Sequence, residues 1–373
     1  MRRFRTRRAI AATAVALAAV LGAGGWAADT QSAVTGPPPG SAAWTADTAL
    51  GLQPPDPATS TPARVASFFA GLTPAQQDAL AARHPLVVGN LDGAPARLRY
   101  RANTLALAAE RTRELARATD PALTPQDQQA ARTRAERYRT LLDGDRQILA
   151  FDPRGRGQVA EVFGDLATAA RTAVIVPGSD IDLLTFDRAT DPYGTPAGMA
   201  RALRQATDGG TAVIAWAGYT TPVGVGVDAA TEDLARAGAT RLTRLLDGLA
   251  VSTHPQAPPT VFCHSYGSVV CGLARPTRAR ASALVVLGSP GMGVDSAADL
   301  DPDVPLWATT RNGSDWIGNV PNVRLFGLGH GADPTGPGFG ARRLPSTGSH
   351  GHTGYFAPGT ASLAAYAAIA LGH

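Results

Sequence analysis

The sequence has no lysine, only two cysteines and few charged residues. All 34 basic residues are arginine, and charged residues make up 17% of the 373 positions. Because 44% of the residues are hydrophobic, the chain can bury a large core, which argues against both intrinsic disorder and a small disulfide-dependent scaffold. The absence of lysine beside abundant alanine is typical of high-GC codon usage and indicates no function.

Excess positive charge is also absent from most of the chain, although the formal net charge is +4. The first 27 residues hold five arginines and no acid, so the remainder has 29 arginines against 30 acidic residues. The basic balance therefore belongs to the N-terminal segment and does not predict a nucleic-acid-binding face.

Only one apolar run, Ala9–Ala28, approaches the length of a bilayer. It follows the arginine-rich start, and Gly25 and Ala27 place small residues at the −3 and −1 positions of a cleavage site after residue 27. Residues 1–27 are thus expected to be a signal peptide or an uncleaved signal anchor; the paired arginines also raise twin-arginine export, whose remaining consensus is missing. Since the arginines stay inside, both interpretations predict a secreted or cell-envelope protein. Only the anchor interpretation adds a membrane tether, and it would be through this segment alone.

Two segments of different texture follow. Residues 28–62 are rich in proline, glycine, alanine and serine and are expected to be a linker or a strap across the surface. Residues 63–147 are expected to be a helical unit, because Thr73 and Thr124 each precede a proline, as N-caps do at helix starts. We see no catalytic constellation in this unit.

From residue 148 to 373, short apolar runs alternate with amphipathic stretches, which predicts a mostly parallel sheet covered by helices on both faces. The expected helices are Pro196–Ala206, Ala229–Leu249, Tyr266–Ala274 and Thr360–Leu371. The expected strands are Ile148–Asp152, Gln158–Phe163, Ala173–Val176, Ala212–Trp216, Thr260–His264, Ala283–Leu287, Leu306–Thr310 and Val323–Phe326.

The sharpest motif is the small-x-Ser-x-Gly pattern at residues 263–267, between an apolar strand and an apolar helix. This is the context of a nucleophile elbow, where Ser265 would stand on a strained strand-to-helix turn. The N–H of Tyr266 could donate to an oxyanion there. The alternative is a serine that has only a structural role in a tight turn. We expect the side chain of His264 to point away from the reaction on so tight a turn.

A serine of this kind needs an acid and a base, which such folds supply in the order serine, acid, histidine. Asp315 is the only carboxylate in the loop after the seventh expected strand and is the predicted acid, with a loop-capping aspartate as the alternative. His352 precedes the last helix and is the predicted base, ahead of His350 and His330.

The loop after the third strand should supply a second oxyanion donor. The sequence there is Pro177-Gly178-Ser179, so the N–H of Gly178 or of Ser179 is the candidate, and a plain proline–glycine turn is the alternative.

The two cysteines, Cys263 and Cys271, bracket the predicted nucleophile at similar depth on adjacent elements. They are expected to be either a disulfide or two small buried thiols. The histidines near the C-terminus show no close metal-ligand spacing, and the glycines at residues 336–340 lack a flanking strand and helix. We therefore expect neither a metal nor another cofactor.

The chain resembles a family of secreted, high-GC bacterial α/β-hydrolases formerly catalogued as a domain of unknown function. The similar motifs span almost all of the chain after the leader: residues 88–95, 176–178, 263–268, 288–291 and 351–356. The resemblance implies an α/β-hydrolase fold with a helical N-terminal region and a triad on Ser265, Asp315 and His352. The spacing around Asp315 departs from the pattern of the family.

Together these features predict an exported serine hydrolase that cleaves a small-molecule or lipid-like ester, or a thioester or amide, through an acyl-enzyme. An esterase is favoured over a peptidase, because no acidic pocket for a substrate amine is evident. The alternative from another class is a non-catalytic cell-envelope binding protein on the same fold.

Overall fold

The structure is a computed structural model that describes residues 30–253 and 255–373. The predicted signal peptide or anchor at residues 1–27 lies outside the described residues. In the described part of the chain, no helix is long and apolar enough to cross a membrane.

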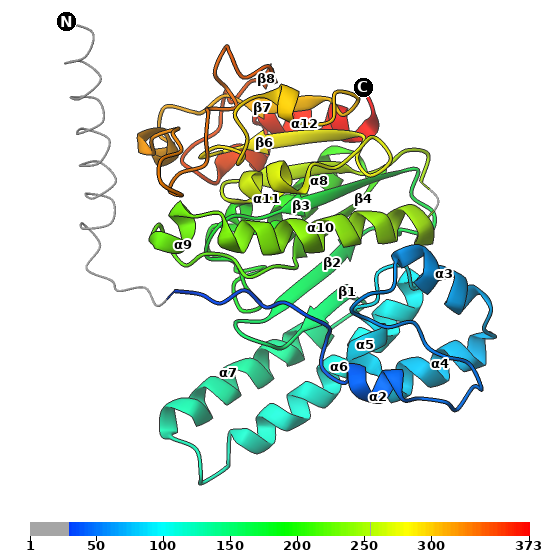
Figure 1. The fold of residues 1–373 in the computed structure, drawn as a ribbon. Helices are drawn as coiled ribbons and strands as arrows, with labels where there is room; N and C mark the ends of the chain where they lie inside the picture. Colours follow the sequence, from blue (N-terminus) through cyan, green and yellow to red (C-terminus); the bar gives the residue numbers. More distant parts are fainter. Residues whose placement is uncertain (1–29, 254) are drawn as a thin grey trace, which may run out of the picture.

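An eight-stranded sheet forms the centre of the molecule, in the order β1-β2-β4-β3-β5-β6-β7-β8 (Figure 1). β1 and β2 pair antiparallel, β2 pairs antiparallel with β4, and all later neighbours are parallel. The strands are Gln147–Asp152, Gln158–Phe163, Arg171–Val176, Thr211–Ala217, Thr260–His264, Ala283–Leu287, Leu306–Thr309 and Arg342–Leu344. The predicted α/β sheet is confirmed.

Helices cover both faces of this sheet because its central strands are buried on both sides. Side chains such as Val174 and Val261 pack with those of α10 (Asp233–Ser252) and α11 (Gly267–Ala274). Their neighbours in sequence point to the other face, towards α8 (Pro196–Ala206) and α12 (Ala361–Leu371). This alternation follows from the two-residue period of a strand.

The N-terminal helices form a layer beside the antiparallel end of the sheet (Figure 1). Thr73 and Thr124 cap their helices as expected, and Thr73 forms a reciprocal capping box with Gln76. The helices are α2 (Ser41–Thr45), α3 (Pro62–Ala70), α4 (Pro74–Arg83), α5 (Pro85–Val88), α6 (Ala96–Arg117) and α7 (Pro125–Leu142). A core around Trp44, Phe69 and Leu91 belongs to this layer alone.

The proline-rich segment before α2 runs across the surface of the sheet domain (Figure 1). The N–H of Val34 donates to Thr220 Oγ1 at 2.9 Å, and the N–H of Gln31 donates to Asp228 Oδ2 at 2.6 Å. We call residues 31–38 the strap. The strap therefore connects α2 to the part of the sheet domain around Thr220 and Asp228.

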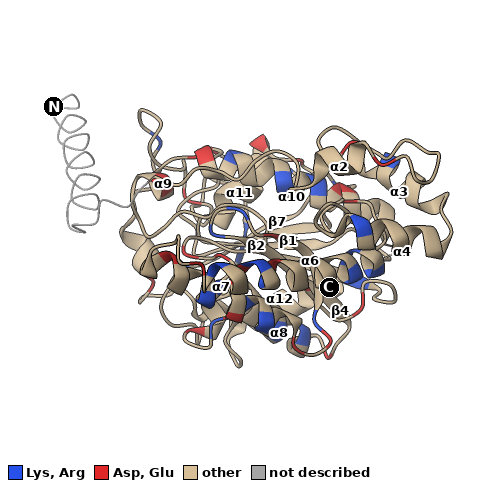
Figure 2. Cartoon of the chain, turned by 90° about the horizontal axis from the view of Figure 1, so that it is seen from below, with Lys and Arg blue, Asp and Glu red and all other residues tan. Residues whose placement is uncertain are grey.

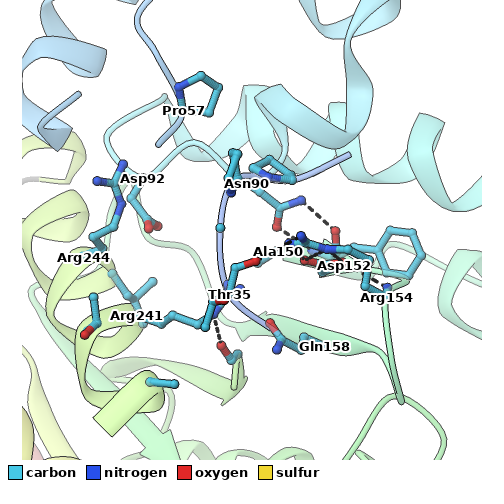
Figure 3. A pocket seen from close by; sticks show the side chains of 18 of the residues that line it. Thr35, Pro57, Asn90, Asp92, Ala150, Asp152, Arg154, Gln158, Arg241 and Arg244 are labelled. Atoms are coloured by element: carbon cyan, nitrogen blue, oxygen red, sulfur yellow. Dashed lines mark hydrogen bonds and ion pairs between the residues drawn. The ribbon is translucent and has the colours of Figure 1, made fainter. Parts of the chain in front are cut away.

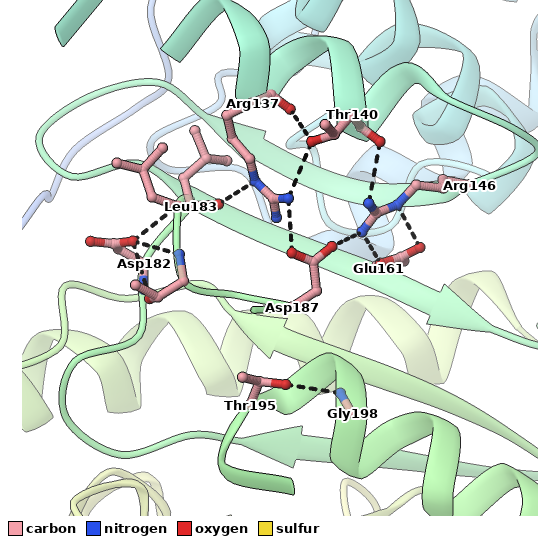
Figure 4. A network of polar contacts seen from close by, with 11 residues as sticks. Arg137, Thr140, Arg146, Glu161, Asp182, Leu183, Asp187, Thr195 and Gly198 are labelled. Carbon is pink, nitrogen blue, oxygen red and sulfur yellow. Dashed lines mark hydrogen bonds and ion pairs between the residues drawn. The ribbon is translucent and has the colours of Figure 1, made fainter. Parts of the chain in front are cut away.

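A buried ionic network ties α7 and the β1–β2 hairpin to the loop before α8 (Figure 4). Arg146 contacts Glu161 at 2.5 Å and Asp187 at 2.9 Å. Arg137 reaches the other oxygen of Asp187 at 2.8 Å and the carbonyl of Leu183 at 2.6 Å. Asp187 bridges the two guanidinium groups and Glu161 pairs with Arg146, which keeps all four charges paired in a largely dry site. On the surface, arginines and acids are interspersed along the helices (Figure 2).

The prediction of a last strand at Val323–Phe326 is wrong. Leu325 and Leu328 pair only with each other around a tight turn, where Phe326 has a φ of 50° and is 95% exposed. The eighth strand is β8, which pairs with β7. It is a three-residue edge strand with two exposed arginines, so it lacks the apolar run by which strands are recognised.

Candidate active site

Ser265 lies on the turn between β5 and α11, as the elbow motif predicts. Its φ is 56°, in the left-handed region that a non-glycine residue seldom adopts. Its N–H donates to the carbonyl of Leu287 on the neighbouring strand at 3.0 Å. The strained turn thus keeps the serine next to the ends of β3 and β6.

Two glycines let the backbone approach this turn. A β-carbon on Gly267 would lie 2.5 Å from the carbonyl oxygen of Val176, so the second residue after the serine has no space for a side chain. A β-carbon on Gly178 would lie 2.5 Å from Ser265 Cβ and 2.9 Å from its Oγ. The Pro177-Gly178 loop is therefore in direct contact with the serine.

Asp315 and His352 form a hydrogen-bonded pair across two loops. His352 Nδ1 lies 2.8 Å from Asp315 Oδ1, and the aspartate side chain is fully buried. Because a carboxylate can only accept, Nδ1 carries the proton of the neutral ring and Nε2 is left as a base. This is the predicted acid–base pair, brought together from residues 37 apart in sequence.

The carboxyl group of Asp315 is held in its ionised form. Burial alone would raise its pKa, but hydrogen bonds from His352, Tyr355 and the N–H of Ile317 outweigh burial and lower the pKa below its ordinary value. Asp315 can therefore orient His352 and balance a positive charge on its ring.

Sequence reasoning missed the residues that hold this pair in place. Tyr355 donates its hydroxyl proton to Asp315 Oδ2 at 2.5 Å. Asn312 Nδ2 donates to the carbonyl of Gly351 at 2.8 Å, and Gly351 N–H donates to Ser314 Oγ at 2.8 Å. Tyr355 belongs to the C-terminal motif that resembles the family, which was the one available signal, but only the fold shows what its hydroxyl contacts.

His264 is closer to the candidate base than expected. Its ring lies 4.8 Å from the ring of His352, and its Nε2 lies 2.9 Å from the carbonyl oxygen of His352. Because that carbonyl only accepts, Nε2–H of His264 is the donor. Burial, and then the nearby His352, lower the pKa of His264 to about 3. The sequence did not indicate this contact: His264, as a neutral ring, donates to the backbone of the candidate base and packs against its ring.

Neither of the other two candidate bases is hydrogen-bonded to Asp315 within the described chain. His350 is exposed. His330 is buried, its Nε2 lies 2.7 Å from the carbonyl oxygen of Ala229, and its ring meets Tyr266 edge-on at 5.5 Å. Of the three histidines, His352 is the one that contacts a carboxylate.

The remaining nitrogen of His352 is unoccupied. Nε2 is buried and has no hydrogen-bond partner within the described chain, so it does not bond Ser265 Oγ in this state. Trp316 packs on the His352 ring at 4.6 Å and lines the same cavity as Ser265. Such contacts between base and nucleophile are often long in unliganded sites and shorten when substrate binds.

The predicted oxyanion donors surround the serine. Among the described residues, the N–H groups of Tyr266, Gly178 and Ser179 donate to no protein acceptor. The hydroxyl of Tyr266 donates to the carbonyl of Thr231 at 2.8 Å and fixes the start of α11. Tyr219 donates to the carbonyl of Pro177 at 2.7 Å and fixes the opposite loop.

The two cysteines form a disulfide, with 6.4 Å between their Cα atoms. Of the two alternatives left open by the sequence, the structure therefore has the bonded one. The bond joins β5 to α11 on either side of Ser265 and constrains the turn between them.

A small apolar cavity of about 80 Å³ opens beside Ser265. Neither acids nor arginines line it. Its walls are Ser179, Val225, Ala229, Ala230, Tyr266, Pro290, Trp316, Ile317, Val320, Pro321, Val323, Gly329 and His330. No group of three or more potential metal ligands converges within the described residues.

Comparison with known proteins identifies the family. A family model described as α/β hydrolase matches residues 152–325. The uncharacterized protein Mb0988c of Mycobacterium bovis (strain ATCC BAA-935 / AF2122/97) is 34% identical over 187 residues, which are 48% of this chain and 69% of that protein. With the sheet order and the elbow described above, these matches show that the chain belongs to the α/β hydrolase family, which confirms the resemblance seen in the sequence.

A longer match covers more of the chain. The uncharacterized protein Rv2079 of Mycobacterium tuberculosis (strain ATCC 25618 / H37Rv) is 30% identical over 386 residues, which are 85% of this chain and 56% of that protein. The chain thus spans little more than half the length of this relative.

Solved structures with similarity include apo Thermogutta terrifontis esterase 2, at 15% identity and a TM-score of 0.34, over 57% of this chain and 87% of that one. The dienelactone hydrolase-like promiscuous phosphotriesterase P91 from metagenomic libraries matches at 14% identity and a TM-score of 0.34, over 58% and 90% of the two chains.

Proposed function

We propose that this α/β hydrolase is a serine esterase with Ser265 as nucleophile, His352 as general base and Asp315 as the orienting acid. The observation that carries the proposal is the buried Asp315–His352 pair at 2.8 Å, beside a serine held at a φ of 56°. A loop aspartate with only a structural role would not need to bind a histidine that lies beside Ser265 with its second nitrogen free within the described chain.

In the proposed reaction, Ser265 Oγ attacks the carbonyl carbon of the ester while His352 Nε2 takes its proton. When the tetrahedral intermediate collapses, the carbon–oxygen bond to the leaving group breaks and His352 returns the proton to the departing alkoxide. Water then attacks the acyl-enzyme by the same route, which releases the acid and restores Ser265. Asp315 stays ionised throughout.

The negative oxygen of each intermediate would be stabilised by the N–H of Tyr266 and one N–H from the opposite loop. Ser179 lines the cavity together with Ser265 and Tyr266, whereas Gly178 packs against the serine β-carbon. This arrangement favours Ser179 N–H as the second donor.

The cavity supports an uncharged, short acyl group as substrate. Its described walls carry no charge that would select an ionic group, and apolar cavities of about 150 Å³ accommodate benzene. A cavity of about 80 Å³ has room for a short acyl chain. Two of the lining residues, Val225 and Trp316, are more than 40% exposed, so the apolar wall extends to the surface, which suits a lipid-like ester.

The proposal is tested by labelling the protein with a fluorophosphonate and locating the adduct by mass spectrometry. A single adduct on Ser265, absent from Ser265→Ala, is expected, together with faster hydrolysis of short-chain than of long-chain p-nitrophenyl esters. A folded protein that gains no adduct and turns over no ester would contradict the proposal and favour a binding protein on the same fold.

We further propose that the protein acts outside the cytoplasm. The arginine-rich, apolar N-terminus supports this proposal, and so does the Cys263–Cys271 disulfide, because such bonds persist in oxidising compartments. N-terminal sequencing of the protein recovered from outside the cell is expected to start at residue 28 if the leader is cleaved. A protein found only in the cytoplasm would contradict the proposal.

A further inference from the structure

A second cavity, of about 290 Å³, lies away from Ser265, under the strap (Figure 3). Its cover is formed by Thr35–Pro38 and by Pro57. Its floor comes from the ends of β1 and β4, the start of β2 and one side of α10. It is thus enclosed by the three parts of the molecule: strap, helical unit and sheet domain.

Positive charge exceeds negative charge around this cavity. Four arginines and two aspartates line it. Arg99 pairs with Asp92 at 3.0 Å and Arg154 pairs with Asp152 at 2.6 Å, so each aspartate already has a partner. Arg241 and Arg244 remain, and neither has a carboxylate partner among the described residues.

These two arginines lie one turn apart on α10, on the side that faces the cavity (Figure 3). Arg241 donates Nε to the carbonyl of Gly218, and Arg244 donates one nitrogen to the carbonyl of Ser60 at 3.1 Å. Like charges at this spacing repel each other, and burial lowers the pKa of Arg241. An anion between them would relieve both the repulsion and the desolvation cost.

Gln158 borders the same cavity with an amide that has no partner (Figure 3). The side chain is 3% exposed, and neither its Nε2 nor its Oε1 makes a hydrogen bond within the described chain. A buried amide without partners destabilises the folded state, because it loses its hydrogen bonds to water and gains none in return. Its retention is explained if the amide contacts a ligand that occupies the cavity.

The remaining wall is mostly apolar and includes Trp216, Leu245 and the prolines of the cover. A ligand that fits therefore combines an anionic group with a compact organic body. We propose that this cavity is a second binding site, which takes a small organic carboxylate or phosphate with its anionic group between Arg241 and Arg244 and its body against Trp216, within reach of the Gln158 amide.

The proposal is tested by calorimetric titration of the whole chain with benzoate, phenyl phosphate and inorganic phosphate, with benzyl alcohol as the neutral comparison. The titrations are repeated with Ser265→Ala, so that binding that depends on the serine hydroxyl is distinguished from binding in the second cavity. Saturable binding of one equivalent of an anion is expected, and benzoate against phenyl phosphate decides between carboxylate and phosphate. Absence of saturable binding by all three anions, or equal binding of benzyl alcohol, overturns the proposal.

Two substitutions locate the site. Arg244→Gln is expected to weaken anion binding about tenfold or more, since it removes a charged donor, whereas Arg97→Gln, at an exposed arginine on α6, should leave it unchanged. Gln158→Leu should weaken binding while leaving the melting temperature unchanged or higher, because it removes an unpartnered amide. The proposal is overturned if Arg244→Gln and Gln158→Leu both bind the anion with unchanged affinity. The two variants test the site independently, so one of them still decides the question if the other folds poorly.

Discussion

The half of the candidate site that carries Ser265 consists of a buried strand, a tight turn and a helix, whereas the half that carries Asp315 and His352 consists of two loops. In the first half, backbone pairing, glycine contacts and the disulfide fix the geometry within a few residues of sequence. In the second half, side-chain hydrogen bonds connect residues about 40 positions apart. Backbone contacts therefore hold the geometry of the first half, whereas the geometry of the second half depends on individual side-chain hydrogen bonds.

Ser265→Ala gives the largest expected effect, because it removes the reacting atom while leaving the turn intact. Turnover of short-chain esters should fall on the order of 10⁶-fold, measured as kcat at saturating substrate. Ser296→Ala, at a surface turn, is the matched control and should retain activity. If Ser265→Ala still hydrolyses esters, the nucleophile half has been assigned wrongly.

His352→Gln tests the loop half and should cost nearly as much, on the order of 10⁵-fold or more in kcat. The exposed His350 lies two residues away, and His350→Gln should change kcat by less than about twofold. A large loss in His350→Gln with activity kept in His352→Gln would reverse the assignment of the base.

His264 lies where the two halves meet, and its low pKa predicts a pH-dependent stability. The folded state keeps the ring neutral down to about pH 3, whereas the unfolded chain binds a proton near pH 6.5. The stability contribution is therefore fully present above pH 6.5 and is lost as the pH falls. At pH 4.5, two units below the pKa of the unfolded chain, this loss amounts to about 3 kcal/mol in the free energy of unfolding.

Urea unfolding at pH 6.5 and 4.5 measures this dependence. The drop in stability should be smaller in His264→Gln than in the wild type, while His350→Gln should keep the wild-type drop. Buried His330 contributes with the same sign, so the difference between variant and wild type is the informative quantity. Equal drops in His264→Gln and wild type would show that His264 is protonated in the folded state.

The disulfide stabilises the nucleophile half alone. Replacing both Cys263 and Cys271 by alanine reopens a loop with a sequence separation of eight and should lower the free energy of unfolding by about 2–3 kcal/mol. Denaturation curves of the variant, and of the wild type under reducing conditions, should agree. A reduced wild type with unchanged stability would mean that packing alone holds the strand and helix together.

Tyr355→Phe gives the smallest expected effect. It removes the donor to Asp315 Oδ2 and should lower kcat/KM about tenfold, a typical effect for a residue that orients a catalytic group. Tyr366→Phe, which removes a buried hydroxyl bonded to Thr309 in the same core, should reduce stability without this loss of activity. Equal kcat/KM values in both variants would show that Tyr355 is not a positioning residue.

The same contrast explains which predictions from sequence were right. Seven of the eight expected strands, the helix caps at Thr73 and Thr124, and the turn at Ser265 follow from local patterns of a few residues, and the structure has them. β8 was missed because its three residues carry no apolar signal, and pairing with β7 alone makes it a strand. The contact of His264 with His352 was missed because it joins residues 88 apart in sequence.

The sequence by itself determined the α/β alternation, the elbow and the short list of acids and histidines from which the site is drawn, because periodicity and turn chemistry act over neighbouring residues. Only the tertiary structure decided that Asp315 takes His352 rather than His350 or His330, and that Tyr355 and His264 support this pair. It also decided that two arginines with no carboxylate partner in the described part of the chain face a cavity under the strap. Each of these depends on long-range packing, which sets burial and proximity and is not encoded in any one segment.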